Sequence, residues 1–189
     1  QSPLPSMKGS VAPYIIMYDI RSFQVCLHKV TKGIDSGKVV FRKNIFIPSY
    51  LKTPLDINNF LQSKNREMLK EFLIKFEKKF KFKEETQNKF FSSYNIRLFS
   101  EINGWIDWSQ NVEDLDRFIR SFGKPYKGAK TFINDKKVNI QFIEISKQDA
   151  ARHPYEIGRV IRKFEEYIVV CVNGGSLYIK EVFYKNKNI

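Results

Sequence analysis

The sequence has few residues of the kinds that bind metals or cross-link a chain. Only 2 Cys and 2 His occur among its 189 residues, and they do not have the close spacing of a metal site. Cys26 and Cys171 both lie in apolar runs, which is typical of buried, reduced thiols. We therefore expect no metal and no disulfide scaffold, and we expect a cytoplasmic protein.

Long apolar runs are also missing. No stretch approaches the roughly 18–20 consecutive apolar residues that span a bilayer, and no stretch has the pattern of a signal peptide. We therefore expect that the protein has no membrane partner.

Apolar and aromatic residues are abundant. Hydrophobic residues make up 42% of the sequence and aromatic residues 15%, with 17 Phe. This is enough to build a core, so disorder, collagen-like repeats and a disulfide miniprotein are excluded. The length fits one domain of ordinary size, or one domain with a small appendage.

The net charge is +13, and it permits two interpretations. Clustered Lys and Arg bind phosphates by releasing counterions, so a basic chain suggests a nucleic-acid partner. Here the excess is Lys, which is spread along the chain, and the one dense cluster lies at residues 75–83. Generic surface charge and a polyanion-binding face both remain open.

The first half of the chain predicts two strands followed by a long helix. Residues 1–13 have no period and predict a loop, and residues 14–20 are apolar. From Thr53 an apolar stripe recurs at three- and four-residue spacing, which predicts an amphipathic helix of about 25 residues. We expect the stripe to lie in the core, and a partner groove is the alternative. The stripe is Leu61, Met68, Leu69, Phe72, Leu73, Phe76 and Phe80. The predicted strands are 21–29, 39–47 and 95–101, and the predicted loop is 84–93.

The second half predicts one short helix and then strands. Ser109 is the expected helix cap and Gly123 the expected stop, with an apolar stripe of Val112, Leu115, Ile119 and Phe122. Val138, Ile140 and Phe142 alternate with polar residues, which predicts a strand. Residues 167–172 and 177–183 flank Asn-Gly-Gly-Ser at 173–176, a strong hairpin signal.

Three segments, in this order, resemble the folate-dependent formyltransferases. SPLPSMKGSVAP (2–13) resembles the family's S-x-LP-x-x-[RK]-G-x-x-P loop, and LHKVTKGIDSGKVVFRKNI (27–45) is similar to its GID-[TS]-G loop and following strand. GWIDWSQNVEDLDRFIRSFGKPYKGAKTF (104–132) resembles the family's IDW helix and the segment that joins core to C-terminal domain. The similarity is closest to nucleotide-sugar N-formyltransferases, with methionyl-tRNA formyltransferase as the near relative.

The resemblance implies an α/β fold. Residues 1–100 are expected to be the C-terminal part of a Rossmann-like formyltransferase core, residues 101–134 a connecting helix and loop, and residues 135–189 a small β-rich subdomain. The family's catalytic set is an Asn, a His two residues later, and an Asp. The Asn-x-His should stand immediately before SPLP, where this sequence has neither residue. We therefore expect that the N-terminal part of the core is absent and that these 189 residues alone are inactive.

The resemblance also assigns candidate site residues. Asp35, in Gly-Ile-Asp-Ser-Gly, matches the catalytic Asp, which orients the His and helps to accept the amine's proton; from its sequence context alone it is a turn former. The stretch whose backbone faces the pterin of 10-formyltetrahydrofolate, the expected co-substrate, matches Thr31, Lys32, Gly33 and Ile34.

Three further residues are candidate contacts to the acceptor substrate. His28 precedes the loop, and a strand histidine with a satisfied hydrogen bond is the alternative. Lys8 stands where the family has Arg or Lys, and it is expected either to meet a phosphate or to be solvated. Tyr126 is expected to stack on an acceptor base or to pack in the core.

Two acceptors fit the resemblance. Residues 133–189 are short for the C-terminal domain of the tRNA enzyme, which favours the amine of a nucleotide-linked amino-deoxysugar, with a role in lipopolysaccharide biosynthesis. Methionyl-tRNA, with tRNA as the partner, is the alternative, and a homodimer is compatible with either. The hypothesis from another class is a non-catalytic basic module in which the β-rich unit and residues 75–83 hold nucleic acid.

Overall fold

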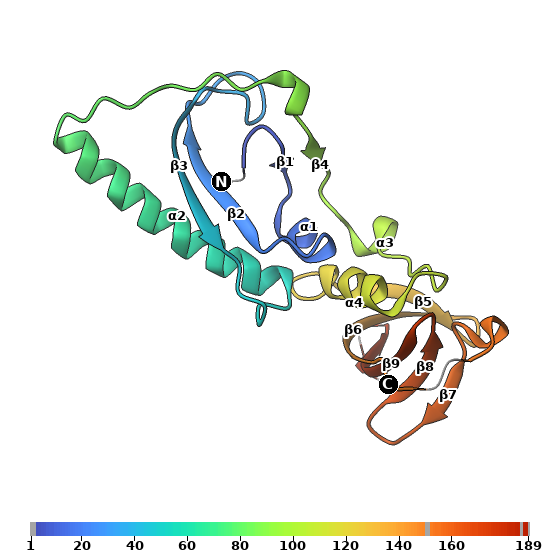
Figure 1. The fold of residues 1–189 in the computed structure, drawn as a ribbon. Coiled ribbons are helices and arrows are strands. Elements are labelled where there is room, and N and C mark those ends of the chain that lie inside the picture. The colour runs from blue at the N-terminus through green and yellow to red at the C-terminus, as the bar shows by residue number, and fades with distance from the viewer. Residues whose placement is uncertain (1–2, 150–151, 186, 189) are drawn as a thin grey trace. The chain divides into compact units, whose positions relative to one another are not determined.

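The computed structural model describes residues 3–149, 152–185 and 187–188. The chain divides into two compact units. The first consists of residues 1–15 and 19–97, and the second of residues 16–18 and 98–189. Helices and strands are mixed in the first unit and strands dominate the second (Figure 1). The expected α/β class with a small β-rich C-terminal part is confirmed.

The first unit is built on two strand pairs. Strands β2 (Ser22–His28) and β3 (Val39–Phe46) form an antiparallel hairpin in which Phe23 faces Ile45 and Cys26 faces Arg42. Strand β1 (Lys8–Gly9) pairs in parallel with β4 (Tyr94–Asn95). The first unit thus joins two segments that lie far apart in the sequence (Figure 1).

Helix α2 (Pro54–Glu77) packs along the hairpin. It begins where expected because Thr53 and Asp56 form a capping box: the Thr53 hydroxyl accepts from the Asp56 amide, and the Asp56 carboxylate accepts from the Thr53 amide. The face toward the hairpin buries Ile57, Leu61 and Met68.

The expectation that the whole α2 stripe is buried is wrong. Leu69, Leu73, Phe76 and Phe80 are 45–63% exposed. Periodicity identifies an apolar face but not its partner, and the two-stranded hairpin covers only part of this face in the described structure. Phe72 instead packs on aromatic neighbours, with ring centroids 4.6 Å from Phe82 and 6.2 Å from Phe41.

Three local predictions in the first 103 residues need correction. Residues 1–13 are not all loop, because β1 lies there and α1 (Ala12–Met17) begins at Ala12. Residues 84–93 contain a single 3-10 turn, η1 (Lys89–Phe91). Residues 95–101 do not form one strand: β4 ends at Asn95 and α3 (Ser100–Asn103) follows.

The second unit is an antiparallel sheet in the order β5-β6-β9-β8-β7, with β10 also paired to β9. The strands are β5 (Ala129–Ile133), β6 (Lys136–Ser146), β7 (Val160–Lys163), β8 (Ile168–Val172), β9 (Gly175–Tyr184) and β10 (Lys187–Asn188). The expected hairpin at 173–176 joins β8 to β9. A 3-10 turn, η2 (Pro154–Glu156), precedes β7.

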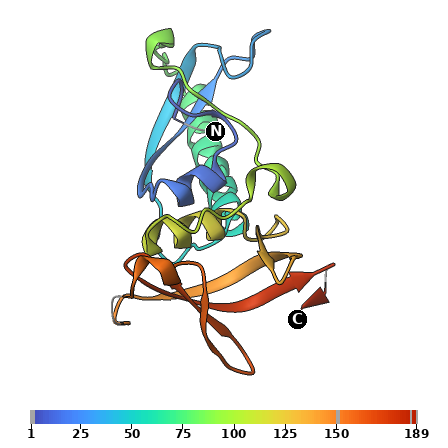
Figure 2. The same cartoon turned by 90° about the vertical axis from the view of Figure 1, so that its right-hand side faces the viewer.

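Helix α4 (Val112–Ser121) packs on this sheet (Figure 2). The predicted apolar stripe is confirmed, because Val112, Leu115, Ile119 and Phe122 are all buried. The cap is Asn111 rather than Ser109: the Asn111 side chain accepts from the Asp114 amide at 2.8 Å. Ser109 instead bonds to the Asp107 carboxylate at 2.6 Å.

Strand β6 departs from strict alternation. Val138 and Ile140 are buried as expected, but Phe142 is 48% exposed. The pairing register with β9 shifts between Ile140 and Phe142 and again before Ile143, so the core position passes to Ile143. Cys26 and Cys171 are both buried, as expected.

Neither unit contains, in its described part, a helix with both the length and the hydropathy that crossing a bilayer requires.

Candidate functional site

The loop between β2 and β3 is held in shape by its own hydrogen bonds. The Lys29 amide donates to the Lys38 carbonyl at 2.9 Å and closes the loop. Inside it, the Thr31 and Ser36 hydroxyls lie 2.7 Å apart, and Ser36 donates to the Gly33 carbonyl at 3.0 Å. A side chain at Gly37 would meet the Lys29 carbonyl oxygen, with its Cβ only 1.8 Å away. The loop therefore requires glycine there.

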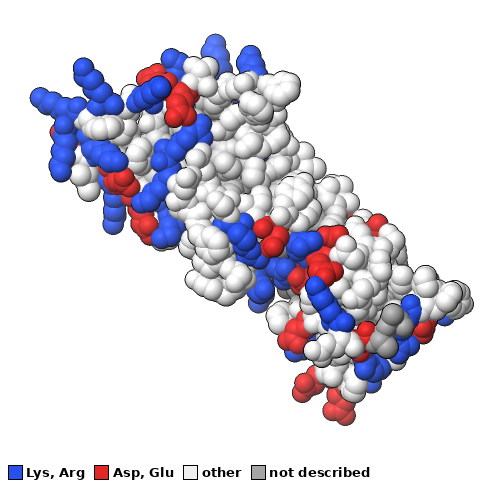
Figure 3. Space-filling view, viewed as in Figure 1, with Lys and Arg blue, Asp and Glu red and all other residues white. Residues whose placement is uncertain are grey.

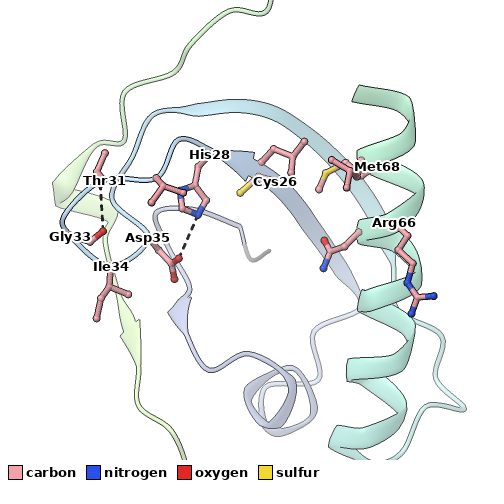
Figure 4. Close-up of a pocket in the computed structure, with 12 residues that line it drawn as sticks. Cys26, His28, Thr31, Gly33, Ile34, Asp35, Arg66 and Met68 are labelled. Atoms are coloured by element: carbon pink, nitrogen blue, oxygen red, sulfur yellow. Dashed lines mark hydrogen bonds and ion pairs between the residues drawn. The ribbon is translucent and has the colours of Figure 1, made fainter. Parts of the chain in front are cut away.

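Asp35 stands at the turn of this loop in the left-handed region, with φ of 47°. Its Oδ1 lies 3.5 Å from His28 Nε2, and its Oδ2 accepts from the Gly9 amide at 3.3 Å. Figure 4 shows Asp35 and His28 pointing toward one another from the loop and the end of β2. One carboxylate oxygen thus accepts from a backbone amide, and the other faces the imidazole of His28.

His28 has an oxygen atom near each ring nitrogen. Nδ1 lies 3.0 Å from the Lys29 carbonyl oxygen, and Nε2 faces Asp35. A neutral imidazole can donate to one of these acceptors, whereas the protonated ring can donate to both. The imidazole therefore orients the Asp35 carboxylate when Nε2 carries the proton.

A residue that the sequence did not suggest also supports the loop. Gln87 Nε2 donates to the carbonyl oxygen of Asp35 at 2.9 Å and to that of Gly37 at 2.7 Å. Its Oε1 is buried without a hydrogen-bond partner in the described structure. Gln87 lies in a polar segment some fifty positions along the chain, and no local pattern distinguishes it.

The loop, β2 and α2 enclose a cavity of about 560 Å³. The expected site residues on its wall are His28, Thr31, Gly33, Ile34 and Asp35. The remaining wall is formed by Cys26, Leu27 and Val30 and, from α2, by Asn65, Arg66, Met68 and Leu69 (Figure 4). The four α2 residues were not predicted, because the helical pattern identified Met68 and Leu69 only as core and gave Asn65 and Arg66 no role.

The other candidate residues lie outside this wall. Lys32 is exposed on the same loop. Lys8 is half-buried in β1, next to the glycine that holds Asp35. Tyr126 belongs to the second unit, half-buried, with its ring 6.2 Å from that of Phe122. The roles of Lys8, Lys32 and Tyr126 in binding stay predictions.

The cavity combines an apolar wall with a polar end. Val30, Ile34, Met68 and Leu69 supply the apolar surface, and the Asp35–His28 pair stands at the polar end. Such a volume is typical of a small-molecule site. In the described parts of the chain, no group of three or more His, Cys, Asp or Glu side chains is placed to hold a metal ion.

Residues 99–189 match the family model described as "Formyl transferase, C-terminal domain". This match confirms the resemblance to the formyltransferases that the motifs indicated. The matched residues do not include the cavity, because the residues that line it lie between Cys26 and Leu69.

One curated relative extends the similarity over the whole chain, and a second covers half of it. It is 29% identical over 195 aligned residues to the bifunctional polymyxin resistance protein ArnA of Wigglesworthia glossinidia brevipalpis, covering 100% of this chain and 28% of that protein. It is 30% identical over 95 residues to the methionyl-tRNA formyltransferase of Marinobacter nauticus, covering 50% of this chain and 29% of that one. The chain thus spans less than a third of the length of either relative.

Solved structures share the fold. The N-formyltransferase of Helicobacter canadensis, in complex with folinic acid and dTDP-3-aminofucose, matches with a TM-score of 0.71 at 21% identity, over 95% of this chain and 63% of that one. HypX from Aquifex aeolicus, in complex with tetrahydrofolic acid, matches with a TM-score of 0.73 at 19% identity, over 100% of this chain and 32% of that one.

Proposed function

We propose that this protein transfers a formyl group from 10-formyltetrahydrofolate to the amine of a nucleotide-linked amino-deoxysugar. The observation that carries the proposal is the Asp35–His28 pair, 3.5 Å apart at the polar end of the 560 Å³ cavity. Similarity to the formyltransferases supports the reaction class, and the cavity beside this pair supports the choice of site.

The residues around the cavity fit a reduced folate. A flat pterin ring needs an apolar wall with polar backbone groups at its edge, and the cavity offers Ile34, Met68 and Leu69 beside the backbone of Thr31 and Gly33. Arg66 on α2 is exposed at the wall, and its guanidinium suits the glutamate carboxylates of a folate. Folinic acid and tetrahydrofolic acid are bound by the two structural neighbours.

The chemistry assigns a task to Asp35. An amine that attacks a formyl carbon must lose a proton as the new amide bond forms, and a fixed carboxylate can accept it. The Gly9 amide and His28 hold the two oxygens of Asp35 in place. The carboxylate that accepts the proton therefore does not have to reorient during the reaction. His28 is thus a positioning residue for Asp35.

The 189 residues contain no Asn-x-His. We propose that these two groups come from residues outside this sequence. An amide donor to the developing oxyanion is worth about 2.7–4 kcal/mol in other acyl-transfer enzymes, so Asp35 and His28 without it are expected to give little transfer.

The choice of acceptor depends on the relatives. The Helicobacter canadensis protein is complexed with dTDP-3-aminofucose at a TM-score of 0.71, and that match covers 95% of this chain. In the same structural comparison, the methionyl-tRNA formyltransferase from Clostridium thermocellum matches with a TM-score of 0.58 over 78% of this chain. This difference favours the sugar amine, and methionyl-tRNA remains the alternative acceptor.

Folate binding by the 189-residue chain tests the site without requiring turnover. We expect saturable binding of folinic acid in a calorimetric titration. Leu69→Gln should weaken it, because Leu69 lines the cavity. The matched control is Leu73→Gln, one turn further along α2 and 47% exposed against 45% for Leu69, which should leave it unchanged. No binding, or equal weakening by both variants, would refute the assignment of this cavity.

The basic end of α2 supports a second function, binding of nucleic acid. Lys78, Lys79, Lys81 and Lys83 make no salt bridge within the described residues, and Phe76 and Phe80 beside them are 63% and 57% exposed. Figure 3 shows blue side chains gathered over this end of the helix. Ammonium groups with interleaved aromatic rings are a pattern of single-strand binding. This function predicts salt-dependent binding of RNA, and the binding should be lost when Lys78, Lys79 and Lys81 are changed to Glu. If the protein retains no RNA at low salt, the function is excluded.

A further inference from the structure

The second unit contains a basic cavity that the formyl-transfer proposal does not use. Its volume is about 490 Å³, and it lies among the loop before β5, strand β6 and the end of β9. Its charged wall consists of Glu101, Lys127, Lys130, Lys137 and Lys185. Four ammonium groups therefore share the cavity with a single carboxylate.

Lys130 is an unusual lysine because its side chain is only 1% exposed. Its ammonium forms a salt bridge with Glu101 and lies 5.5 Å from the centroid of the Trp105 ring. The Lys137 ammonium lies 5.5 Å from the same ring. Burying a charged side chain is costly unless it is paired. The salt bridge to Glu101 and the contact with the Trp105 ring therefore stabilise this cation at the cavity wall.

The remaining ammonium groups are not neutralised. Within the described parts of the chain, Lys127, Lys137 and Lys185 have no salt-bridge partner. Glu101 is 60% exposed, and Lys130, followed by Lys137 and Lys127, holds the pKa of its carboxyl below the ordinary value. One carboxylate thus balances one of four positive charges.

The loop that presents Lys127 is fixed by strand β6. Asn139 Nδ2 donates to the Lys127 carbonyl oxygen at 2.8 Å, and Gln141 Nε2 donates to that of Tyr126 at 3.5 Å. Gly128 follows with φ of +101°, and a Cβ there would lie 2.6 Å from the Ile140 carbonyl oxygen. The backbone at Lys127 is therefore held in place before any ligand arrives, which lowers the ordering cost of binding.

We propose that this cavity binds the phosphate groups of a small molecule, with Lys127, Lys137 and Lys185 as the ligating cations and Lys130 as the buried positive charge behind them. A net excess of three positive charges matches a diphosphate. The volume of the cavity lies within the range of small-molecule sites, which favours a compact anion. A long polyanion would instead need an extended basic groove.

Calorimetric titration of the 189-residue chain with inorganic pyrophosphate tests this proposal. Lys137→Ala should weaken binding about tenfold, the loss of one charge-assisted hydrogen bond. The control is Lys163→Ala, an exposed lysine of β7 outside the cavity, which should change nothing.

The outcomes separate a built site from diffuse charge. No saturable binding, or equal weakening by Lys137→Ala and Lys163→Ala, would overturn the proposal. Retention of an RNA oligonucleotide that pyrophosphate does not displace would assign the charge to a polyanion surface instead.

A second titration identifies the source of the phosphate. A nucleoside diphosphate that binds more tightly than pyrophosphate, with the same sensitivity to Lys137→Ala, would extend the site to a nucleotide. Equal affinities would restrict the site to the phosphate groups. The proposal does not depend on formyl transfer, so failure of the folate titration leaves it standing.

Discussion

The amide of Gly9 donates a hydrogen bond to Oδ2 of Asp35, 26 residues further along the chain. Gly9 can approach because it has no side chain: a Cβ there would lie 2.5 Å from the Asn95 carbonyl oxygen of β4. Its φ of +81° is also a conformation that residues with a side chain rarely adopt. The Lys-Gly of the N-terminal motif thus orients the candidate catalytic carboxylate through its glycine.

Gly9→Ala is therefore expected to destabilise the first unit by about 2 kcal/mol or more, the sum of left-handed strain of about 1–2 kcal/mol and a backbone clash. Gly174→Ala is the matched control, because it has the same φ of +81° but its nearest neighbour is Val112 Cγ1 at 3.8 Å. Gly174→Ala should lose only the part of the unfolding free energy that comes from left-handed strain. Gly9 lies in the first unit and Gly174 in the second, so urea unfolding is followed separately for each unit. Equal losses of unfolding free energy in the two units would contradict the close approach of β1 to β4.

Gln87→Glu should loosen the loop at residues 29–38. The change replaces a donor to two carbonyl oxygens with a carboxylate that faces them, at a cost of about 1–3 kcal/mol. Hydrogen exchange at the amides of residues 29–38 should accelerate accordingly. Gln62→Glu makes the same change on the exposed face of α2 and should leave that exchange unaltered. Unchanged exchange in Gln87→Glu would mean that the loop does not need this support.

Arg66→Ala is expected to weaken the binding of folinic acid about fivefold, because one exposed ion pair contributes about this much to the affinity. A reduced pterin without the glutamate should bind both proteins equally, because only the glutamate carries carboxylates. Lys70→Ala, an exposed cation of the same helix outside the cavity wall, serves as the control. Loss of pterin binding in Arg66→Ala would show that Arg66 acts on the shape of the cavity instead.

The second unit should show an acid-sensitive ion pair between β7 and the segment after β6. Arg162 donates to the Asp149 carboxylate at 2.8 Å and holds the pKa of Asp149 below its ordinary value of 3.8. A carboxyl whose pKa is lowered by folding adds stability above its unfolded pKa, and loses it as the pH falls through the folded pKa. Arg162→Ala should therefore be less stable than the parent at pH 5–7, with the difference closing below about pH 3.8. A difference that stays constant to pH 2 would contradict this role of the pair.

Sequence patterns predicted the elements whose signals are local. The β2–β3 pair, α2 and the β8–β9 hairpin follow from alternation, helical spacing and turn residues within a few positions. Local signals failed where the outcome depends on a distant partner. The exposed face of α2 and the register shifts in β6 both depend on which strands lie alongside.

The candidate site divides in the same way. Family motifs identified the loop with Asp35, and the structure brings it together with His28 and the backbone of Thr31 and Gly33. They did not identify Gln87 or the α2 residues Asn65 and Arg66, because these reach the loop through tertiary packing.

The central claim is that Asp35 takes part in formyl transfer, and the most direct measurement compares the parent protein with Asp35→Asn. The protein should be assayed as its gene encodes it, with any residues that precede Gln1, using 10-formyltetrahydrofolate against a panel of nucleotide amino-sugars and charged initiator tRNA. We predict transfer to an amino-sugar, and a loss of about 10²–10⁴-fold in Asp35→Asn, the usual contribution of a positioned acid–base group. Folinic acid binding and the unfolding midpoint should change little. Full activity in Asp35→Asn would contradict the account.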